Sequence, residues 1–351
     1  MRNTLLNGCI LFILGTTGCQ KNENETKPEI DRSVLNLNIP ERLKFLETSM
    51  NAPPDNKPDG KKVSLGRALF YEKMLSVDQS INCASCHQPK FAFSTNEPVS
   101  LGINHQESVR SAPALINLAW KSTYFWDGRK GSLEEQAGDP ILNPREMGSD
   151  WTTVLSRLNA SKKYRDLAKA AFGTEQITNQ TVRYSLAQFE RTLNSFHSKE
   201  DEIMAKPQVN IGIITVPKEN DAGRQLFYEH CGSCHGGTHF TYGGYANIGL
   251  KLDPTERGRA LVTNNDWDED AFAIPTLRNI ALTAPYMHDG RFATLREVVD
   301  HYAGKLDTSG TNLDYRINKR LKLSAVQKID LISYLNTLTD RQFTSNSYFA
   351  E

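Results

Sequence analysis

Two stretches of the chain have the apolar spacing of a buried amphipathic helix. In the first, apolar residues recur every three or four positions: Val182, Leu186, Phe189 and Leu193. A second stretch has similar spacing: Val326, Ile329, Ile332, Leu335 and Leu338. Because residues three and four apart share one helix face, both stripes are predicted to face a hydrophobic core. Strand patterns are sparse, so the fold is predicted to be mainly α-helical.

Each of these helices closes one copy of a repeated pattern. The segment G-R-A-L-F-Y-E at 66–72 returns as G-R-Q-L-F-Y-E at 223–229. A longer segment, 113–135, matches 275–297 at a constant offset of 162 residues. A repeat over so many positions indicates two related modules, and 351 residues are enough for two domains. Between the copies, 206–219 has prolines near both ends and no helical period, which favours a linker.

The N-terminus has the order of a secretory signal: a basic Arg2, a short apolar run, then small residues before Cys19. The run is too short for a permanent membrane helix. A lipoprotein signal with Cys19 as the lipidated residue is expected, and a plain cleaved signal is the alternative. The expected organisation is a signal at 1–19, a tether and arm at 20–59, an N-terminal domain at 60–205, a linker at 206–219, a C-terminal domain at 220–340 and a tail at 341–351.

The charge balance excludes some classes of partner. Lysine plus arginine and aspartate plus glutamate each number 41, so the formal net charge is zero. No bulk field therefore favours nucleic acid or an anionic membrane. Membrane association is expected only through a lipid on Cys19, and the signal places the protein in the periplasm or cell envelope of a bacterium.

Beyond the signal region, cysteine occurs only in two C-x-x-C-H motifs. Their residues are Cys83, Cys86 and His87 in the first, and Cys231, Cys234 and His235 in the second. Two thiols about one turn apart can form thioethers with a haem, and the adjacent histidine then becomes the proximal iron ligand. The alternatives are a zinc site or a redox disulfide. Two complete motifs in an exported chain favour two covalently bound haem c groups.

The two copies differ at positions that matter for haem chemistry. The offset puts Trp126 opposite His288 and Pro140 opposite Tyr302. Tyrosine can ligate a haem iron and proline cannot, so the second haem is predicted to be six-coordinate and the first to have an accessible face. Glu146, the nearest carboxylate after Pro140, is a candidate base for moving a proton on bound peroxide. From the residues alone, Tyr302 could equally be a half-buried helix tyrosine and Glu146 a solvated charge or helix cap.

Other aromatic and histidine residues carry weaker signals. Trp126 could be an electron relay between two redox centres or an ordinary core aromatic, and His105 could reach the first iron from a loop. The histidines outside any motif are expected to be structural or exposed: His197, His230, His239 and His301.

Taken in order, these motifs resemble the bacterial di-haem cytochrome c peroxidase family, which includes the MauG-type enzymes. The matching segments are L-G-R-A-L-F-Y-E, C-A-S-C-H, R-S-A-P-A-L-I-N, Y-F-W-D-G-R, N-P-R-E-M-G, C-G-S-C-H, L-R-N-I-A-L-T-A-P-Y-M-H-D-G-R-F and L-R-E-V-V-D-H-Y, and they cover about residues 60–340. The resemblance implies two cytochrome c-like domains packed together, a peroxidatic N-terminal haem and an electron-transferring C-terminal haem. It also implies that Glu146 is the distal acid and Trp126 the tryptophan between the haems.

The resemblance further implies a calcium ion between the domains. The matching positions are Ser111, Thr283 and Pro285, where the family usually has asparagine in place of the serine. Tyr302 stands where ordinary peroxidases of the family have methionine and MauG-type enzymes have tyrosine. A phenolate stabilises ferric iron, so the second haem is expected to be harder to reduce.

The loop 100–110 departs from many fully oxidised peroxidases of the family. Ile103 takes the place of their distal histidine, and His105 follows two residues later. The first haem is therefore expected to be open without reductive activation.

The resulting prediction is reduction of hydrogen peroxide to water, with electrons entering at the second haem and passing Trp126. The expected donor is a small cytochrome c or a cupredoxin. One alternative is MauG-like oxidation of a protein side chain, and another is a non-catalytic di-haem electron carrier. Whether the chain forms a homodimer is left open.

Overall fold

The computed structural model describes residues 37–206, 208–211, 214–217, 221–250, 252–307, 312–317 and 321–351. Contacts divide the chain into the units Met1–Asp31 and Arg32–Glu351, and all the described residues belong to the second unit. The predicted signal, its Cys19 and the tether up to residue 36 lie outside the described residues. In the part that is described, no helix is both long and apolar enough to cross a membrane.

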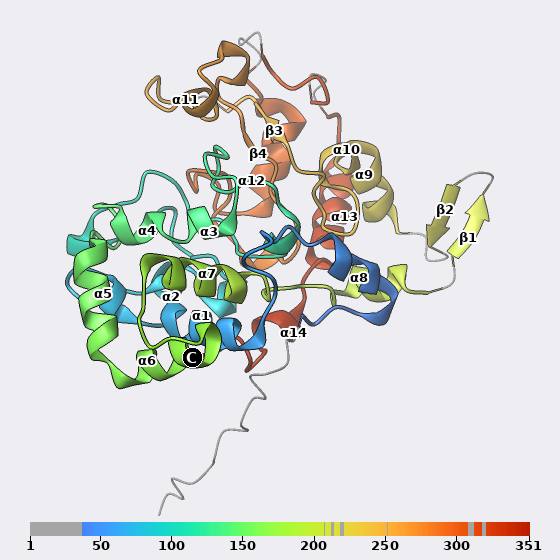
Figure 1. Ribbon diagram of the computed structural model, residues 1–351. Helices are drawn as coiled ribbons and strands as arrows, with labels where there is room; N and C mark the ends of the chain where they lie inside the picture. Colours follow the sequence, from blue (N-terminus) through green and yellow to red (C-terminus); the bar gives the residue numbers. More distant parts are fainter. Residues whose placement is uncertain are drawn as a thin grey trace, which may run out of the picture. The chain divides into compact units, whose positions relative to one another are not determined.

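The fold is mainly helical, as predicted (Figure 1). The first half contains the α-helices α1 (Gly60–Phe70), α2 (Cys83–Cys86), α3 (Leu133–Gln136), α4 (Asp139–Leu142), α5 (Trp151–Ala160), α6 (Lys162–Phe172), α7 (Asn179–Glu190) and α8 (Lys199–Met204). Its 3-10 segments are η1 (Glu41–Ser49), η2 (Lys73–Leu75), η3 (Pro89–Phe91), η4 (Ile103–His105) and η5 (Leu118–Trp120). The second half contains β1 (Gln208–Ile211), β2 (Ile214–Pro217), α9 (Ala222–His230), α10 (Gly232–His235), β3 (Tyr245–Ala246), α11 (Ala260–Thr263), η6 (Asp266–Asp268), β4 (Phe272–Ala273), η7 (Ile280–Leu282), α12 (Leu295–Asp300), the π-helical η8 (His301–Lys305), α13 (Ala325–Asn336) and α14 (Arg341–Thr344).

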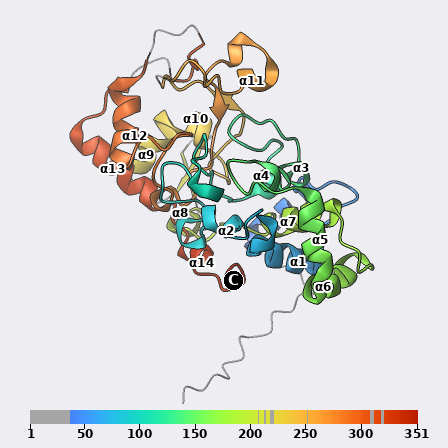
Figure 2. The ribbon, with the colours of Figure 1, turned by 90° about the vertical axis from the view of Figure 1, so that its left-hand side faces the viewer.

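The repeated G-R-x-L-F-Y-E segment forms the same helix crossing twice. α1 packs on α7 and α9 packs on α13, and the two pairs lie on different sides of the unit (Figures 1 and 2). Each crossing needs a glycine: a Cβ on Gly66 would lie 1.8 Å from the Ser185 carbonyl oxygen, and one on Gly223 would lie 2.1 Å from that of Asp330. The internal duplication in the sequence is therefore also a duplication of packing.

A repeated asparagine fixes the end of each closing helix segment. Asn117 and Asn279 both have a left-handed backbone, with φ of 53° and 59°. The Asn117 side-chain oxygen accepts from the Ser195 amide at 2.8 Å, and the Asn279 oxygen accepts from the Asp340 amide at 2.7 Å. Ser195 lies just beyond α7 and Asp340 just beyond α13. In both copies, the same asparagine hydrogen bond therefore connects the segment after the C-x-x-C-H motif to the last long helix of that copy.

The two predicted apolar stripes have different outcomes. All four residues of the first stripe are buried, with at most 1% of their surface exposed, which confirms it. In the second, Val326 and Ile329 are exposed at 65% and 60%, so their prediction as core was wrong. α13 carries apolar residues on more than one face, and the face that packs on α9 is formed by Leu331, Tyr334 and Leu335.

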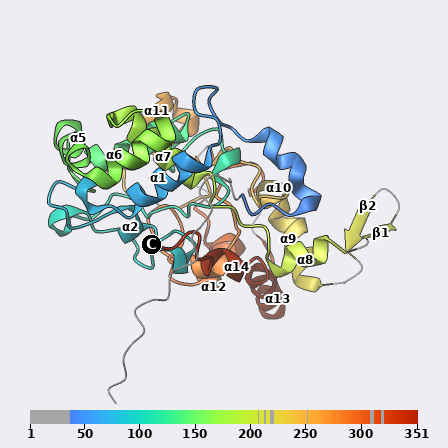
Figure 3. The same ribbon diagram turned by 60° about the horizontal axis from the view of Figure 1, so that its bottom comes forward.

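The segments predicted as linker and tail have structure of their own. The described part of 206–219 is an antiparallel hairpin in which Gln208 pairs with Pro217 and Ile211 with Ile214. The C-terminal segment returns through α14 to the first half (Figure 3). There Phe343 and Phe349 are buried against Phe93, with ring centroids 5.5 and 6.0 Å away.

Candidate functional site

Each C-x-x-C-H motif forms a short helix that presents its cysteines and histidine together. In the first, Asn82 caps α2 by accepting from the Ser85 amide at 3.0 Å, and the Ser85 hydroxyl in turn accepts from the Asn82 amide. In the second, Cys231 closes α9, and α10 carries Cys234 and His235. Spacing along a helical turn therefore brings each pair of thiols next to one histidine.

Each of the two histidines is oriented by a hydrogen bond to a backbone carbonyl oxygen. His87 Nδ1 lies 2.9 Å from the Phe93 carbonyl oxygen, and His235 Nδ1 lies 3.1 Å from that of Pro275. Burial lowers both pKa values, that of His235 to about 4, so both rings are neutral at physiological pH. A neutral ring that donates from Nδ1 keeps the Nε2 lone pair available for a metal, as an axial haem ligand requires.

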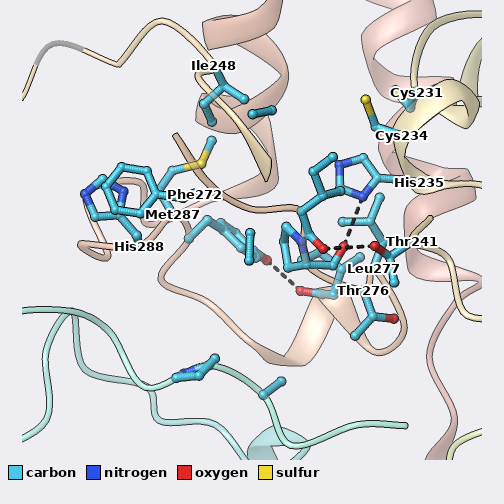
Figure 4. Close-up of a pocket in the computed structure, with 18 of the residues that line it drawn as sticks. Cys231, Cys234, His235, Thr241, Ile248, Phe272, Thr276, Leu277, Met287 and His288 are labelled. Atoms are coloured by element: carbon cyan, nitrogen blue, oxygen red, sulfur yellow. Dashed lines mark hydrogen bonds between the residues drawn. The ribbon is translucent and has the colours of Figure 1, made fainter. Parts of the chain in front are cut away.

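A cavity of about 590 Å³ opens beside the second motif. Figure 4 shows Cys234 and His235 on one side of it and His288, stacked on Phe272, on the other. Apolar side chains from α12 and α13 complete much of the wall, including Leu295, Val299, Leu331 and Leu335. A mainly apolar cavity bordered by two thiols and a neutral histidine fits a covalently held macrocycle.

Tyr302 lies in the wall of the same cavity. It belongs to the π-helical segment after α12, an irregularity that is frequent at functional sites. Burial raises the pKa of its phenol, and the Cys231 and Cys234 sulfurs would raise it further if they were ionised. Tyr302 and both cysteines of the second motif therefore line one cavity, and iron ligation by Tyr302 stays a prediction.

Glu146 lies beside a second cavity of about 340 Å³, whose wall also includes Arg129 and Asn143. Its carboxylate accepts from Asn143 Nδ2 at 2.7 Å. Burial raises its pKa, although the Asn143 hydrogen bond and the Arg129 charge act in the opposite direction. The charge of Glu146 also raises the thiol pKa of Cys83 and Cys86, which locates it near the first motif.

The loop that carries Ile103 and His105 packs on the Glu146 loop. The Ile103 amide donates to the Glu146 carbonyl oxygen at 2.8 Å, and the Ile103 side chain is buried. His105 is exposed. The structure therefore brings Ile103 to the Glu146 region and does not bring the His105 side chain into that group.

Trp126 and the three predicted calcium residues all line the larger cavity. The Trp126 indole donates to the Ser111 carbonyl oxygen at 2.8 Å, and the Ser111 amide donates to the His288 carbonyl oxygen at 2.7 Å. Ser111, Thr283 and Pro285 offer only neutral oxygens, and that of the Ser111 backbone is already engaged. These residues alone do not fit the oxygen-rich shell of calcium, so no chemical step is assigned to that ion.

The other uses considered for the C-x-x-C-H motifs lack supporting geometry. Among the described residues, Cys83, Cys86, Cys231 and Cys234 form no disulfide bond. Within the described ranges, no group of three or more His, Cys, Asp or Glu side chains is arranged to hold a metal ion. A tetrahedral zinc site would need such a group.

Sequence reasoning missed two charged residues at the site. Lys121 lines the larger cavity although it belongs to the first half. Arg110 pairs with Asp127 at 2.7 Å and with Glu256 at 2.8 Å, next to Trp126. Asp127 and its neighbour Arg129 belong to the repeated D-G-R triplet and contact each other at 3.2 Å. Nothing local identifies Arg110, which lies 17 residues earlier, or its second partner Glu256, which lies in the other half.

Comparison with known proteins gives a consistent result. Residues 60–208 match the model of the di-haem cytochrome c peroxidase family. The chain is 32% identical to a methylamine utilization protein MauG of Methylophilus methylotrophus, over 88% of this chain and 92% of that protein. It is 34% identical to a cytochrome c551 peroxidase of Nitrosomonas europaea, over 79% and 80% of the two chains. The crystal structure of a MauG-like protein associated with microbial copper homeostasis aligns with a TM-score of 0.80 at 29% identity, over 90% of this chain and 99% of that one.

These similarities define an oxidoreductase of the peroxidase type that uses haem. The chain belongs to the di-haem cytochrome c peroxidase family, which includes MauG. The resemblance inferred from the ordered motifs is thereby confirmed.

Proposed function

We propose that the chain reduces hydrogen peroxide to water in two cytochrome c-like domains, about 60–205 and 220–340, each with one covalent haem c. Cys83, Cys86 and His87 would hold the first haem, and Cys231, Cys234 and His235 the second. Tyr302 would give the second haem its other axial ligand. A cation at the phenol oxygen offsets the effect of burial on its pKa, so ligation is compatible with a buried site.

The observation that carries this proposal is the placement of Glu146. Burial raises the pKa of its carboxyl group, and the group borders a cavity. Its charge also raises the pKa of both cysteines of the first motif. The overall reaction takes two electrons and two protons per peroxide and yields two water molecules. When bound, the first haem supplies the iron at which the oxygen–oxygen bond is cleaved. Glu146 would move the proton from the inner to the outer oxygen so that water can leave.

Electrons would enter at the second haem and pass Trp126. In support, Trp126 lines the cavity of the second motif while its indole is bonded to Ser111 of the first half. The donor would be a small cytochrome c or a cupredoxin in the periplasm or cell envelope, where a lipid on Cys19 would anchor the chain.

Two alternatives use the same scaffold. MauG-like oxidation of a protein side chain is favoured by Tyr302 at the ligand position. Such an enzyme would consume peroxide without the small donor protein, whereas a peroxidase turns over only with it. A pure electron carrier would need both irons closed, and the half-buried Glu146 beside a cavity argues against that.

The test is stopped-flow absorption of the fully ferric and the pre-reduced holoprotein mixed with hydrogen peroxide. The ferric protein is expected to react at once, because Ile103 replaces a blocking histidine. In Glu146→Gln the side chain keeps its shape but loses the base, so the rate should fall by roughly 10²- to 10⁴-fold.

Glu135→Gln is the matched control, since Glu135 is an exposed glutamate of α3 in the same half. It should react like the wild type. If neither redox state of the wild type reacts, the chain is an electron carrier; if Glu146→Gln reacts at the wild-type rate, Glu146 is not the base.

A further inference from the structure

The cavity of the second motif is built partly by the first half of the chain. Cys231, Cys234 and His235 border it, whereas the residues of the first motif do not. The segment 120–126, from the first half, forms part of its wall, and this segment includes Trp120, Lys121 and Trp126. A group held in this cavity therefore contacts both halves.

The charges in the cavity wall do not balance. Arg316 is neutralised by Asp314 through contacts of 2.6 and 2.9 Å. For the Lys121 ammonium, no hydrogen bond or ion pair is found within the described part of the chain. Burial is the sole cause that lowers its pKa, to about 8, and no carboxylate acts against it. Lys121 is half-buried in the wall of a mainly apolar cavity, where an ammonium without a counter-charge is unfavourable. This indicates that its partner is not part of the described polypeptide.

Three hydrogen bonds hold the backbone at Lys121. Its amide donates to the Leu118 carbonyl oxygen at 3.1 Å. Its own carbonyl oxygen accepts from the Tyr124 hydroxyl at 2.9 Å and from Asn51 Nδ2 at 3.0 Å. The turn thus determines where the side chain begins, whatever residue occupies it.

The repeated copy shows that this turn does not require lysine. The offset of 162 residues puts Thr283 opposite Lys121, after an equivalent 3-10 segment, η7. Tyr124 and Tyr286 donate to the equivalent carbonyl oxygens of Leu118 and Ile280, at 3.2 and 3.0 Å. The same turn accommodates lysine in one copy and threonine in the other. The turn therefore does not explain why residue 121 is lysine, and the group that occupies the cavity does.

We propose that the Lys121 ammonium forms an ion pair with a propionate of the haem held by Cys231, Cys234 and His235. This rests on the haem attachment in the proposed function. A haem carries two carboxylates on one edge, and they are the anions that such a cavity would have to neutralise. A residue of the first half thereby positions the haem of the second, and its positive charge stabilises the reduced, more negative state of that haem.

The test compares Lys121→Met and Lys121→Arg with the wild-type holoprotein. Spectroelectrochemical titration gives the midpoint potential of each haem, and resonance Raman of the reduced protein gives the propionate bending band. In Lys121→Met, the potential of the second haem should fall, that of the first should stay, and the band should shift. Lys121→Arg should restore both. Lys162→Met, at a lysine whose side chain is 79% exposed, should change neither.

A pyridine haemochrome assay on every variant separates the failure of this inference from that of the proposed function. Wild type without two covalent haems would overturn the haem attachment itself. With two haems present, an unchanged potential and band in Lys121→Met would overturn only the ion pair. If Lys121→Met fails to fold, Lys121→Gln replaces it, and an unchanged band there has the same meaning.

Discussion

Glu190, at the end of α7, is a carboxyl group with little to stabilise its charge. It is 5% exposed, and its Oε2 atom has no hydrogen bond in the described part of the chain. Burial raises its pKa to about 8 from 4.5; Arg191 acts against this and Glu134 adds to it. Arg191 is already engaged by both oxygens of Glu134, at 2.7 and 2.9 Å. The neighbouring arginine therefore leaves Glu190 largely uncompensated.

This carboxyl group should make the stability of the fold depend on pH. Between the two pKa values the folded protein keeps the proton and the unfolded chain releases it. The stabilisation is complete below the unfolded pKa of 4.5 and is lost as pH rises through about 8. Between pH 5.5 and 8.5, the free energy of unfolding should therefore fall by about 3 kcal/mol more in wild type than in Glu190→Gln. Urea titrations of the holoprotein at several pH values measure the difference, and parallel pH profiles of the two proteins would contradict it.

At the scale of the element, the crossing of α9 and α13 depends on Gly223. A Cβ there would lie 2.1 Å from the Asp330 carbonyl oxygen and 2.9 Å from the Tyr334 Cβ. Neither atom is the end of a flexible side chain, so Gly223→Ala must push the helices apart. A loss of about 1–3 kcal/mol in the free energy of unfolding is expected, as in other overpacked cores.

The control for this crossing is Gly131→Ala. Its added Cβ would have only Glu135 Oε2 nearby, at 3.9 Å, so a change within about 0.5 kcal/mol is expected. Urea unfolding of both variants gives the comparison. If both substitutions lowered the free energy of unfolding equally, the close approach of the helices would not be the reason why position 223 requires glycine.

Local patterns predicted much of the fold, and their failures have physical reasons. The stripe from Val182 to Leu193 faces one core, so its period identified the buried face. Val326 and Ile329 extend a similar pattern in a helix that is apolar on several faces, and only packing on α9 selects which face is buried. Repeat comparison and resemblance also gave roles to Glu146 and Tyr302, and these roles stay predictions. The sequence could not identify Lys121, because its importance depends on a cavity whose thiols lie more than a hundred residues later.

At the scale of the whole unit, the two halves are joined by buried polar groups. The Asp340 carboxylate, beyond α13, accepts from the amides of Phe196 and His197 and from the Ser195 hydroxyl. Arg278 of the second half forms two hydrogen bonds, of 2.7 and 2.9 Å, with Asp201. Separating the halves would leave these buried polar and charged groups without partners, which is energetically costly. The halves are therefore held together by polar contacts as well as by apolar packing. The proposed electron transfer between two haems would need this fixed relation.

Another contact between the two halves, beside Trp126, depends on Arg110. Its guanidinium contacts Asp127 Oδ2 at 2.7 Å and both carboxylate oxygens of Glu256 at 2.8 Å, with 14% of its side chain exposed. Arg110→Met removes the cation that pairs with Glu256, whereas Asp127 keeps its contact with Arg129 at 3.2 Å, so the free energy of unfolding should fall by about 3 kcal/mol. In Arg110→Met with Glu256→Gln, the loss should be smaller than the sum of the single losses by about 0.5–3 kcal/mol. Lys162→Met, which removes an exposed pair with Asp166, should cost less than about 1 kcal/mol. Additive losses in the Arg110–Glu256 cycle, measured by urea unfolding of the holoprotein, would mean that this contact does not join the halves.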